Sequence, residues 1–309
     1  MAEEAGLLQS RRGGDGSFSL WSERFGEAFH AAEGALGEAR RKFVEPAELD
    51  RFPPGRELWV LECCVGTATN TAALLEAVRP RGLALRWWGL ELDPRPLELA
   101  LADGGFRAQW HPATLALLEQ LRHGSFAAAG LQGTLLHGDA RGLLPSLLPA
   151  LAGRCDLVLM DAFSPGHCPE LWSQELLQRQ AALLAPQGRW LSYCSAAAVR
   201  QSLRRAGLQL ATIRPHPEGG AAAGSRPPLW SAGTAASPSP LPPSAWLAPL
   251  SPMEREHLAT RAAHPYRDPS GQDTAGRILE RRQREQAAAA AESSGSWRRR
   301  WQLSSGGRR

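Results

Sequence analysis

The stretch ELWVLECCVGTATNTAALLEAVRP (57–80) decides the fold class of this chain. Its first eight residues are mostly apolar, as is typical of a strand that is buried on both faces. A short loop with one glycine follows. TNTAALLEAVRP (69–80) then has the pattern of a helix that ends at Pro80. The stretch therefore predicts one strand–loop–helix unit of a parallel sheet.

The same alternation continues along the chain. Further strands are expected at LALRWWGLEL (83–92), LQGTLLHGD (131–139), CDLVLMD (155–161), RWLSYCS (189–195), LQLATIRP (208–215) and PPLWSAGTA (227–235). Helical patterns separate all of these except the last two, which therefore predict an antiparallel hairpin. The expected fold class is α/β, Rossmann-like, with a mostly parallel sheet and a terminal antiparallel hairpin.

The chain is expected to divide into four regions. Residues 1–50 form an N-terminal extension, in which 1–16 are expected to be disordered, 17–30 a short strand or hairpin, and 34–46 a helix. Residues 51–235 form the Rossmann-like domain. Residues 236–250 are rich in proline and serine, which is typical of a linker. Residues 251–309 are expected to be a helical, basic tail.

The composition narrows the class of protein. The chain has 309 residues, 43% of them hydrophobic, and no run long enough to predict a transmembrane helix or a secretory signal. Its five cysteines lack CxxC spacing, which favours a reducing cytoplasm, and its eight histidines lack metal-binding spacing, so no metal site is expected. All basic residues except Lys42 are arginine.

Acidic side chains follow four successive predicted strands: Glu62, Glu91, Asp139 and Asp161. Ligands of open α/β sheets bind at the carboxyl ends of the strands. The loop after the first strand lacks both GxGxxG and a P-loop lysine, so it does not predict a phosphate-bearing cofactor. A cofactor with ribose hydroxyls and a cationic centre suits the acids better. The sequence therefore predicts S-adenosyl-L-methionine and a class I methyltransferase fold.

Each acid then has an expected contact. Glu91 would accept two hydrogen bonds from the ribose hydroxyls, with Asp93 as the alternative. Asp139 would meet the adenine amino group. Glu62 and the turn at Gly66 would face the methionine end of the cofactor.

Four segments together resemble a known family. They are GSFSLWSERFGEAFHAAEGALGEARRKFVEP (16–46), ECCVGTATN (62–70), DLVLMDAFSPGHCPELWS (156–173) and SYCSAAAVRQSLRRAG (192–207). They are similar to the methyltransferase domain of the bacterial tRNA 5-methylaminomethyl-2-thiouridine biosynthesis protein, MnmC. The resemblance spans about residues 16–233, and its most specific part is Asp-x-Phe-x-Pro followed by Pro-x-x-Trp.

The resemblance implies an activity and partners. The family domain uses S-adenosylmethionine to methylate an aminomethyl group on the wobble uridine, so the anticodon region of tRNA is the expected partner. In many bacteria the domain is fused to an FAD oxidase that supplies this aminomethyl group. Because no dinucleotide motif follows residue 233, the chain resembles a stand-alone form, and a separate enzyme is expected to supply the modified tRNA.

The glycine loop departs from the family pattern. Cys64 and Ala68 replace two of its glycines, Gly66 remains, and Asn70 is retained for cofactor binding. The two substitutions bring side chains toward the cofactor, which favours a weaker affinity.

The resemblance implies that Asp161 lies where the methyl group is transferred. The acceptor is a primary amine, which is normally protonated near neutral pH. Asp161 would bind and orient the ammonium form and accept its proton. Phe163 and Trp172 would stack on the flipped base, and Pro165 would fix the loop.

Two basic segments have two interpretations each. EARRKF (38–43), with Arg40 and Lys42, is either a phosphate contact or a solvated helix face. Residues 277–309 hold nine arginines and three glutamates, a net charge of +6, and either meet tRNA phosphates or form a solvated end.

Other functions stay open from the sequence. One is a methyltransferase for a small amine or a protein, and another is an aminopropyl transferase, against which the Pro-x-x-Trp block argues. A third is a non-catalytic binding module that keeps the fold.

Overall fold

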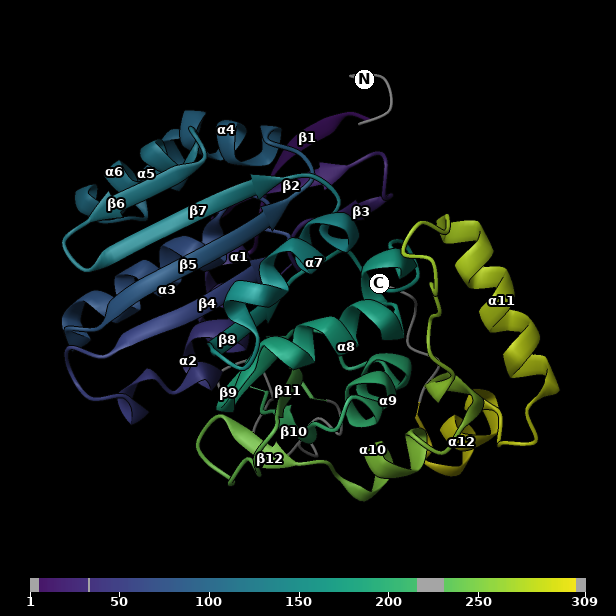
Figure 1. Cartoon of the computed structure of the whole chain (residues 1–309). Coiled ribbons are helices and arrows are strands. Elements are labelled where there is room, and N and C mark those ends of the chain that lie inside the picture. The colour runs from purple at the N-terminus through teal and green to yellow at the C-terminus, as the bar shows by residue number, and fades with distance from the viewer. Residues whose placement is uncertain (1–5, 33, 216–230, 304–309) are drawn as a thin grey trace.

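The computed structural model describes residues 6–32, 34–215 and 231–303. Its centre is a nine-stranded sheet with the strand order β12-β10-β11-β9-β8-β4-β5-β7-β6 (Figure 1). The strands are β4 (Glu57–Cys63), β5 (Ala84–Glu91), β6 (Ser125–Ala128), β7 (Leu131–His137), β8 (Cys155–Met160), β9 (Leu184–Ser192), β10 (Gln209–Ile213), β11 (Gly233–Ser237) and β12 (Leu247–Pro249).

The directions of these strands confirm the predicted fold class. β7, β5, β4, β8 and β9 pair in parallel, whereas β10 and β11 form an antiparallel hairpin. β11 lies between β9 and β10 and is antiparallel to both. All six residues of β8 are buried, as expected for a central strand covered on both faces.

Helices cover both faces of the sheet (Figure 1). α1 (Ala35–Ala39), α3 (Thr69–Val78) and α6 (Pro112–Leu121) pack together on one face. α7 (Ala140–Leu151), α8 (Gln174–Leu183) and α9 (Ala197–Arg205) cover the other. The remaining helices near the sheet are η2 (Arg40–Val44), α2 (Glu45–Ala47), η3 (Leu49–Arg51), η4 (Arg79–Arg81), α4 (Arg95–Ala102), α5 (Gly104–Ala108) and η5 (Pro169–Trp172).

The N-terminal extension is more ordered than the sequence predicts. β1 (Leu8–Arg12), β2 (Phe18–Ser22) and β3 (Glu27–Ala28) form a separate antiparallel sheet. The expectation of disorder over residues 1–16 is therefore wrong for residues 8–12, while residues 1–5 lie outside the described part. The expected helix over 34–46 is present, with a π-helical turn, η2, in its middle.

The C-terminal region is folded onto the domain. Part of the expected linker, residues 247–249, is strand β12, which pairs with β10 at the edge of the main sheet. The linker interpretation is therefore wrong for these residues. α10 (Pro252–His257), η6 (Arg261–Ala263), α11 (Ala275–Ala288) and α12 (Ser294–Arg300) follow it.

The predicted tail is not a solvated end over its described residues. Trp297 is fully buried and stacks on His257 at 4.0 Å between ring centroids. Arg300 forms ion pairs with Glu256 and Glu292. Figure 1 shows α11 and α12 beside α8–α10. These contacts engage part of the arginine charge that the sequence makes available to phosphates.

Candidate cofactor and acceptor site

A cavity of about 650 Å³ opens at the carboxyl ends of β4, β5, β7 and β8. Its floor comes from the loops that follow these strands. Residues 21–22 and 24–32, with Glu38 and Lys42, contribute to its wall from the N-terminal extension. Its volume lies in the range of small-molecule and cofactor sites. The extension is therefore part of the site.

The loop after β4 has a left-handed backbone at two residues other than glycine. Cys64, Gly66 and Ala68 have φ angles of 68°, 54° and 59°, all in the left-handed region. A Cβ atom on Gly66 would lie 3.2 Å from the Phe29 ring, so Gly66 is also needed for space. Left-handed backbone costs about 1–2 kcal/mol for a residue with a Cβ. The loop backbone is therefore strained at Cys64 and Ala68.

Glu91 connects the loops after β4 and β5. Its Oε2 accepts a hydrogen bond from the Gly66 N–H at 2.8 Å, and its Oε1 accepts one from the Asp93 N–H at 2.9 Å. Burial raises the pKa of Glu91, and the backbone hydrogen bonds oppose this rise. Glu91 lines the cavity, where its remaining lone pairs can accept hydroxyl groups. Asp93, the alternative, is engaged by the Arg95 guanidinium at 2.6 Å.

Glu62 does not lie where the sequence analysis expects it. It is fully buried and outside the cavity lining, where its Oε2 accepts hydrogen bonds from Thr71 Oγ1 at 2.8 Å and Trp87 Nε1 at 2.9 Å. Oε1 has no hydrogen-bond partner among the described residues. Burial raises the pKa of Glu62 to about 7. A direct contact with the methionine end is therefore contradicted.

Asp161 follows β8 and lines the cavity. Its Oδ2 accepts a hydrogen bond from Asn70 Nδ2 at 2.7 Å, so Asn70 orients the acid. Burial, followed by the negative charge of Glu38, raises the pKa of Asp161 above its ordinary value. Such an acid readily holds a proton near neutral pH and can also release it.

The two basic residues expected to contact phosphates are placed differently. Lys42 lines the cavity, and its Nζ lies 2.5 Å from Glu38 Oε1 and 5.7 Å from the Tyr193 ring centroid. Arg40 is exposed and outside the cavity lining. Lys42 therefore faces the cavity as an ion-pair partner of Glu38, and a phosphate contact by Lys42 stays a prediction.

Aromatic rings form one wall beside Asp161. Phe163 stacks on Phe25 at 4.4 Å between centroids and meets the edge of Phe29 at 5.0 Å. All three line the cavity. The geometry offers aromatic surface to a planar ligand, and Phe163 is where the sequence analysis expects a stacking residue.

Trp172 is not part of that wall. It is fully buried, and its Nε1 donates a hydrogen bond to the Phe163 carbonyl oxygen at 2.7 Å. The expected stacking of Trp172 on a base is therefore contradicted, because its indole supports the loop from behind. Pro165 is buried within that loop and outside the cavity lining.

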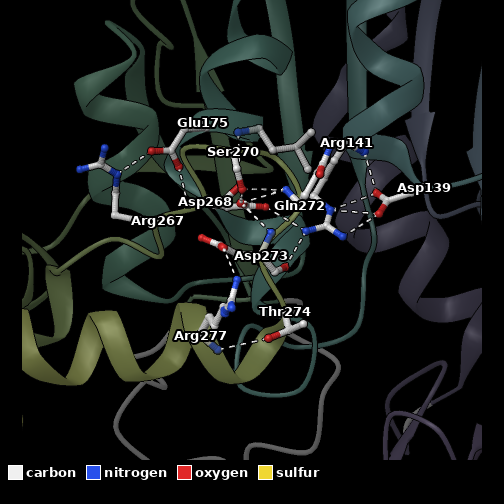
Figure 2. Close-up of polar contacts among 12 residues, drawn as sticks. Asp139, Arg141, Glu175, Arg267, Asp268, Ser270, Gln272, Asp273, Thr274 and Arg277 are labelled. Atoms are coloured by element: carbon white, nitrogen blue, oxygen red, sulfur yellow. Dashed lines mark hydrogen bonds and ion pairs between the residues drawn. The ribbon is translucent and has the colours of Figure 1, made fainter.

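Asp139 lies at the other end of the cavity, at the start of α7. Its carboxylate accepts hydrogen bonds from the Arg141 N–H at 2.9 Å, from Nε at 3.0 Å and from Nη2 at 2.7 Å. Figure 2 shows that the same guanidinium also contacts Asp268 and the backbone of Asp273. Asp139 therefore faces the cavity as an ion-paired carboxylate.

Phe25, Phe29, Glu38 and Tyr193 also line the cavity, although the sequence does not assign them to the site. Each lies in a segment that carries the family resemblance. None has a spacing that assigns it a role, because only the fold brings the extension over the strand ends. The repeated phenylalanines in ERFGEAFH (23–30) are the one local signal.

A family model described as S-adenosyl-L-methionine-dependent methyltransferase matches residues 105–218. The solved structure of MnmC2 from Aquifex aeolicus is similar over 92% of this chain and 86% of that chain, with a TM-score of 0.74 and 25% identity. This chain is an S-adenosyl-L-methionine-dependent methyltransferase, and its structure is similar to that of MnmC2. No helix in the described ranges is long and apolar enough to cross a membrane.

Curated relatives of the methyltransferase are longer proteins. It is 31% identical over 200 residues to the tRNA 5-methylaminomethyl-2-thiouridine biosynthesis bifunctional protein MnmC of Chromobacterium violaceum, and 32% identical over 206 residues to that of Pseudomonas aeruginosa. The matches cover 60% and 62% of this chain but 30% and 31% of the relatives. The chain thus spans about a third of their length.

The cavity of the methyltransferase fits its cofactor. Glu91 would accept the hydroxyl groups of the ribose, and the left-handed turn at Gly66 would lie beside the cofactor. Asp139 offers a carboxylate to an amino group at the far end. When bound, S-adenosyl-L-methionine supplies an electrophilic methyl group on a positively charged sulfur.

Proposed function

We propose that this methyltransferase acts on a primary amine carried by tRNA, the aminomethyl group of the wobble uridine. The observation that carries the proposal is the position of Asp161, a partly buried acid of raised pKa beside the Phe163 wall in the cavity of a methyltransferase. The names of the relatives, which are tRNA 5-methylaminomethyl-2-thiouridine biosynthesis proteins, support the choice of amine. Another activity must first place the aminomethyl group on the uridine.

Asp161 has two tasks in this reaction. Its ionised form binds the arriving ammonium group, and its carboxylate then takes the proton that blocks the nitrogen lone pair. Once this proton is removed, the nitrogen lone pair would be free to accept the methyl group that the bound cofactor supplies. Asn70 holds Asp161 in place through the 2.7 Å hydrogen bond.

The aromatic wall has a task on the acceptor side. Phe163, backed by Phe25 and Phe29, offers stacking surface to a uridine base turned out of the anticodon loop. Stacking on one aromatic side chain contributes about 1–3 kcal/mol. Trp172 contributes indirectly, because its hydrogen bond fixes the backbone of Phe163.

The proposal can be tested with defined tRNA substrates. The purified protein is incubated with S-adenosylmethionine and tRNA that carries 5-aminomethyl-2-thiouridine at the wobble position, and the nucleosides are analysed by mass spectrometry. We expect a singly methylated nucleoside. Matched tRNA with an unmodified wobble uridine should stay unmethylated, because it lacks the amine.

A second arm uses spermidine and a lysine-rich peptide as acceptors. Turnover of either one without turnover of the tRNA would overturn the tRNA assignment and favour a small-amine or protein methyltransferase. Cofactor binding without transfer to any of these acceptors would favour a binding module.

A further inference from the structure

The segment between η6 and the end of α11, residues 264–288, packs against the domain near the cavity. The Tyr266 carbonyl accepts a hydrogen bond from the Gln174 N–H at 2.8 Å, and Arg267 Nε lies 2.6 Å from Glu175 Oε1. α11 also packs against η5, which directly follows the loop of Asp161 and Phe163. We call residues 264–288 the C-terminal strap. The strap therefore lies against elements that build the site.

Asp268 is the polar centre of the strap. Its side chain is fully buried, and its Oδ1 accepts hydrogen bonds from the N–H groups of Gln272 at 3.2 Å and Asp273 at 3.1 Å. Its Oδ2 accepts one from Arg141 Nη1 at 2.9 Å. Burial acts to raise the pKa of Asp268, but the Asp273 N–H and the Arg141 guanidinium outweigh it, so the pKa is lowered.

Arg141 joins this buried acid to the cavity, as Figure 2 shows. One edge of its guanidinium faces the strap, where Nη1 donates to Asp268 and to the Asp273 carbonyl oxygen at 2.9 Å. Its other edge faces Asp139, through Nε and Nη2. A planar guanidinium can bridge two acceptors in this way, whereas an ammonium group cannot hold both in one fixed plane.

Asp139 needs such support. Its side chain is 46% exposed, and among the described residues only the N-cap hydrogen bond from the Arg141 backbone N–H and the Arg141 guanidinium restrict its rotamer. The Arg141 guanidinium donates hydrogen bonds to both carboxylate oxygens of Asp139. Each oxygen keeps a further lone pair that can accept a hydrogen bond from a ligand in the cavity. The orientation of these lone pairs therefore depends on Arg141, and the orientation of Arg141 depends on the strap.

We propose that the C-terminal strap helps to form the cofactor site. Asp268 is a positioning residue: it holds the Arg141 guanidinium, which in turn holds the Asp139 carboxylate toward the adenine amino group. This inference rests on the proposed contact of Asp139 with adenine and not on the identity of the methyl acceptor. It assigns a role in cofactor recognition to a segment outside the Rossmann-like domain.

Calorimetry with S-adenosylhomocysteine and S-inosylhomocysteine tests the inference without measuring methyl transfer. The inosyl analogue carries an oxygen in place of the adenine amino group, so the wild-type protein should bind it about tenfold or more weakly. Asp268→Asn keeps the side-chain shape but removes the charge that holds Arg141. We expect this variant to lose most of the preference for the adenosyl ligand.

Arg267→Gln is the matched control. It removes the ion pair with Glu175 within the same strap but leaves the contacts of Arg141 in place. We expect its preference for the adenosyl ligand to equal that of the wild type within about twofold. Arg141→Lys is a second variant, which keeps a positive charge but cannot bridge both acids, and it should lose the preference even if Asp268→Asn fails to fold.

A double-mutant cycle tests whether Asp268 affects the ligand preference through Asp139. In an Asp139→Asn background, Asp268→Asn should cause no further loss of preference, because both changes act on the same contact. Equal weakening of both ligands by Asp268→Asn would overturn the inference, since a merely structural role predicts that result. Additive losses in the cycle, or an unchanged preference in Arg141→Lys, would overturn it as well. A failure of the tRNA assay leaves these binding results unaffected.

Discussion

At one end of the cavity Asp161 is partly buried and held by the neutral Asn70, whereas at the other end Asp139 is half exposed and held by the charged Arg141. The first environment raises the pKa of the acid, and in the second a guanidinium donates hydrogen bonds to the carboxylate. Two carboxylates in one cavity thus suit different tasks. Asp161 can exchange a proton, while Asp139 can serve as a fixed hydrogen-bond acceptor.

The largest expected effect comes from replacing Asp161. Asp161→Asn keeps the shape of the side chain but cannot accept the proton of the acceptor amine, so the single-turnover rate of methyl transfer should fall about a hundredfold or more. Calorimetry should show affinity for S-adenosylhomocysteine within about threefold of the wild type, because the uncharged sulfur of this ligand does not interact with the charge of Asp161. Asp139→Asn is the paired control, and with saturating cofactor its rate should stay near that of the wild type. Equal rate losses in both variants would contradict the assignment of proton transfer to Asp161 alone.

Glu62 tests whether burial alone produces an acid like Asp161. Its pKa is about 7 in the fold, against an ordinary value of 4.5, so the folded protein binds more protons than the unfolded chain between these values. The contribution of Glu62 to stability is therefore greatest below pH 4.5 and decreases as the pH rises through 7.

Glu62→Gln should remove this dependence. Between pH 5 and 8, urea unfolding should show the variant gaining up to about 3 kcal/mol relative to the wild type. The same difference at both pH values would mean that Glu62 has an ordinary pKa in the fold.

Glu91 should show the next largest effect. Glu91→Ala removes the acceptor for the ribose hydroxyls and for the Gly66 N–H, so the affinity for S-adenosylhomocysteine should fall at least about tenfold. Asp93→Asn is the matched control in the same loop, and its affinity should change less than about threefold. A larger loss in Asp93→Asn than in Glu91→Ala would transfer the ribose contact to Asp93.

The smallest expected effect concerns strain in the loop after β4. Ala68→Gly relieves the left-handed conformation but adds flexibility to the unfolded chain, so the free energy of unfolding should rise by less than about 1 kcal/mol. Gly66→Ala is the opposite case, because its Cβ would press on Phe29, and it should lower both stability and cofactor affinity. A destabilised Ala68→Gly protein would show that the loop is not strained at that position.

Much of the fold could be predicted from the sequence, because strands buried on both faces and intervening helices leave a clear local pattern. β1 was not predictable in this way. It is mostly exposed and reads LQSRR, without the alternation of a half-buried strand. The docked C-terminal region was missed for a different reason. Burial of Trp297 and the ion pairs of Arg300 depend on partners distant in the sequence.

The site was predicted in its position but only partly in its contacts. Acids at strand ends meet at one edge of the sheet by topology, and Glu91, Asp139 and Asp161 all line the cavity. The direction of a side chain at the last residues of a strand is not evident from its neighbours, which is why Glu62 was placed wrongly. Trp172 lies in the short helix η5, where the sequence does not show that its indole turns toward the backbone of Phe163. The N-terminal wall could not be predicted because it depends on how an extension folds across the strand ends.

The most direct test of the account is the proton released when the cofactor binds. Asp161, whose pKa is raised in the fold, should be partly protonated near neutral pH and should lose its proton when a sulfonium arrives beside it. Calorimetry at pH 7 in two buffers with different ionisation enthalpies measures this proton. We predict that S-adenosylmethionine releases more protons than S-adenosylhomocysteine, whose sulfur is uncharged, and that Asp161→Asn abolishes the difference. Equal proton release with both ligands in the wild type, or a difference that persists in Asp161→Asn, would contradict the central role of Asp161.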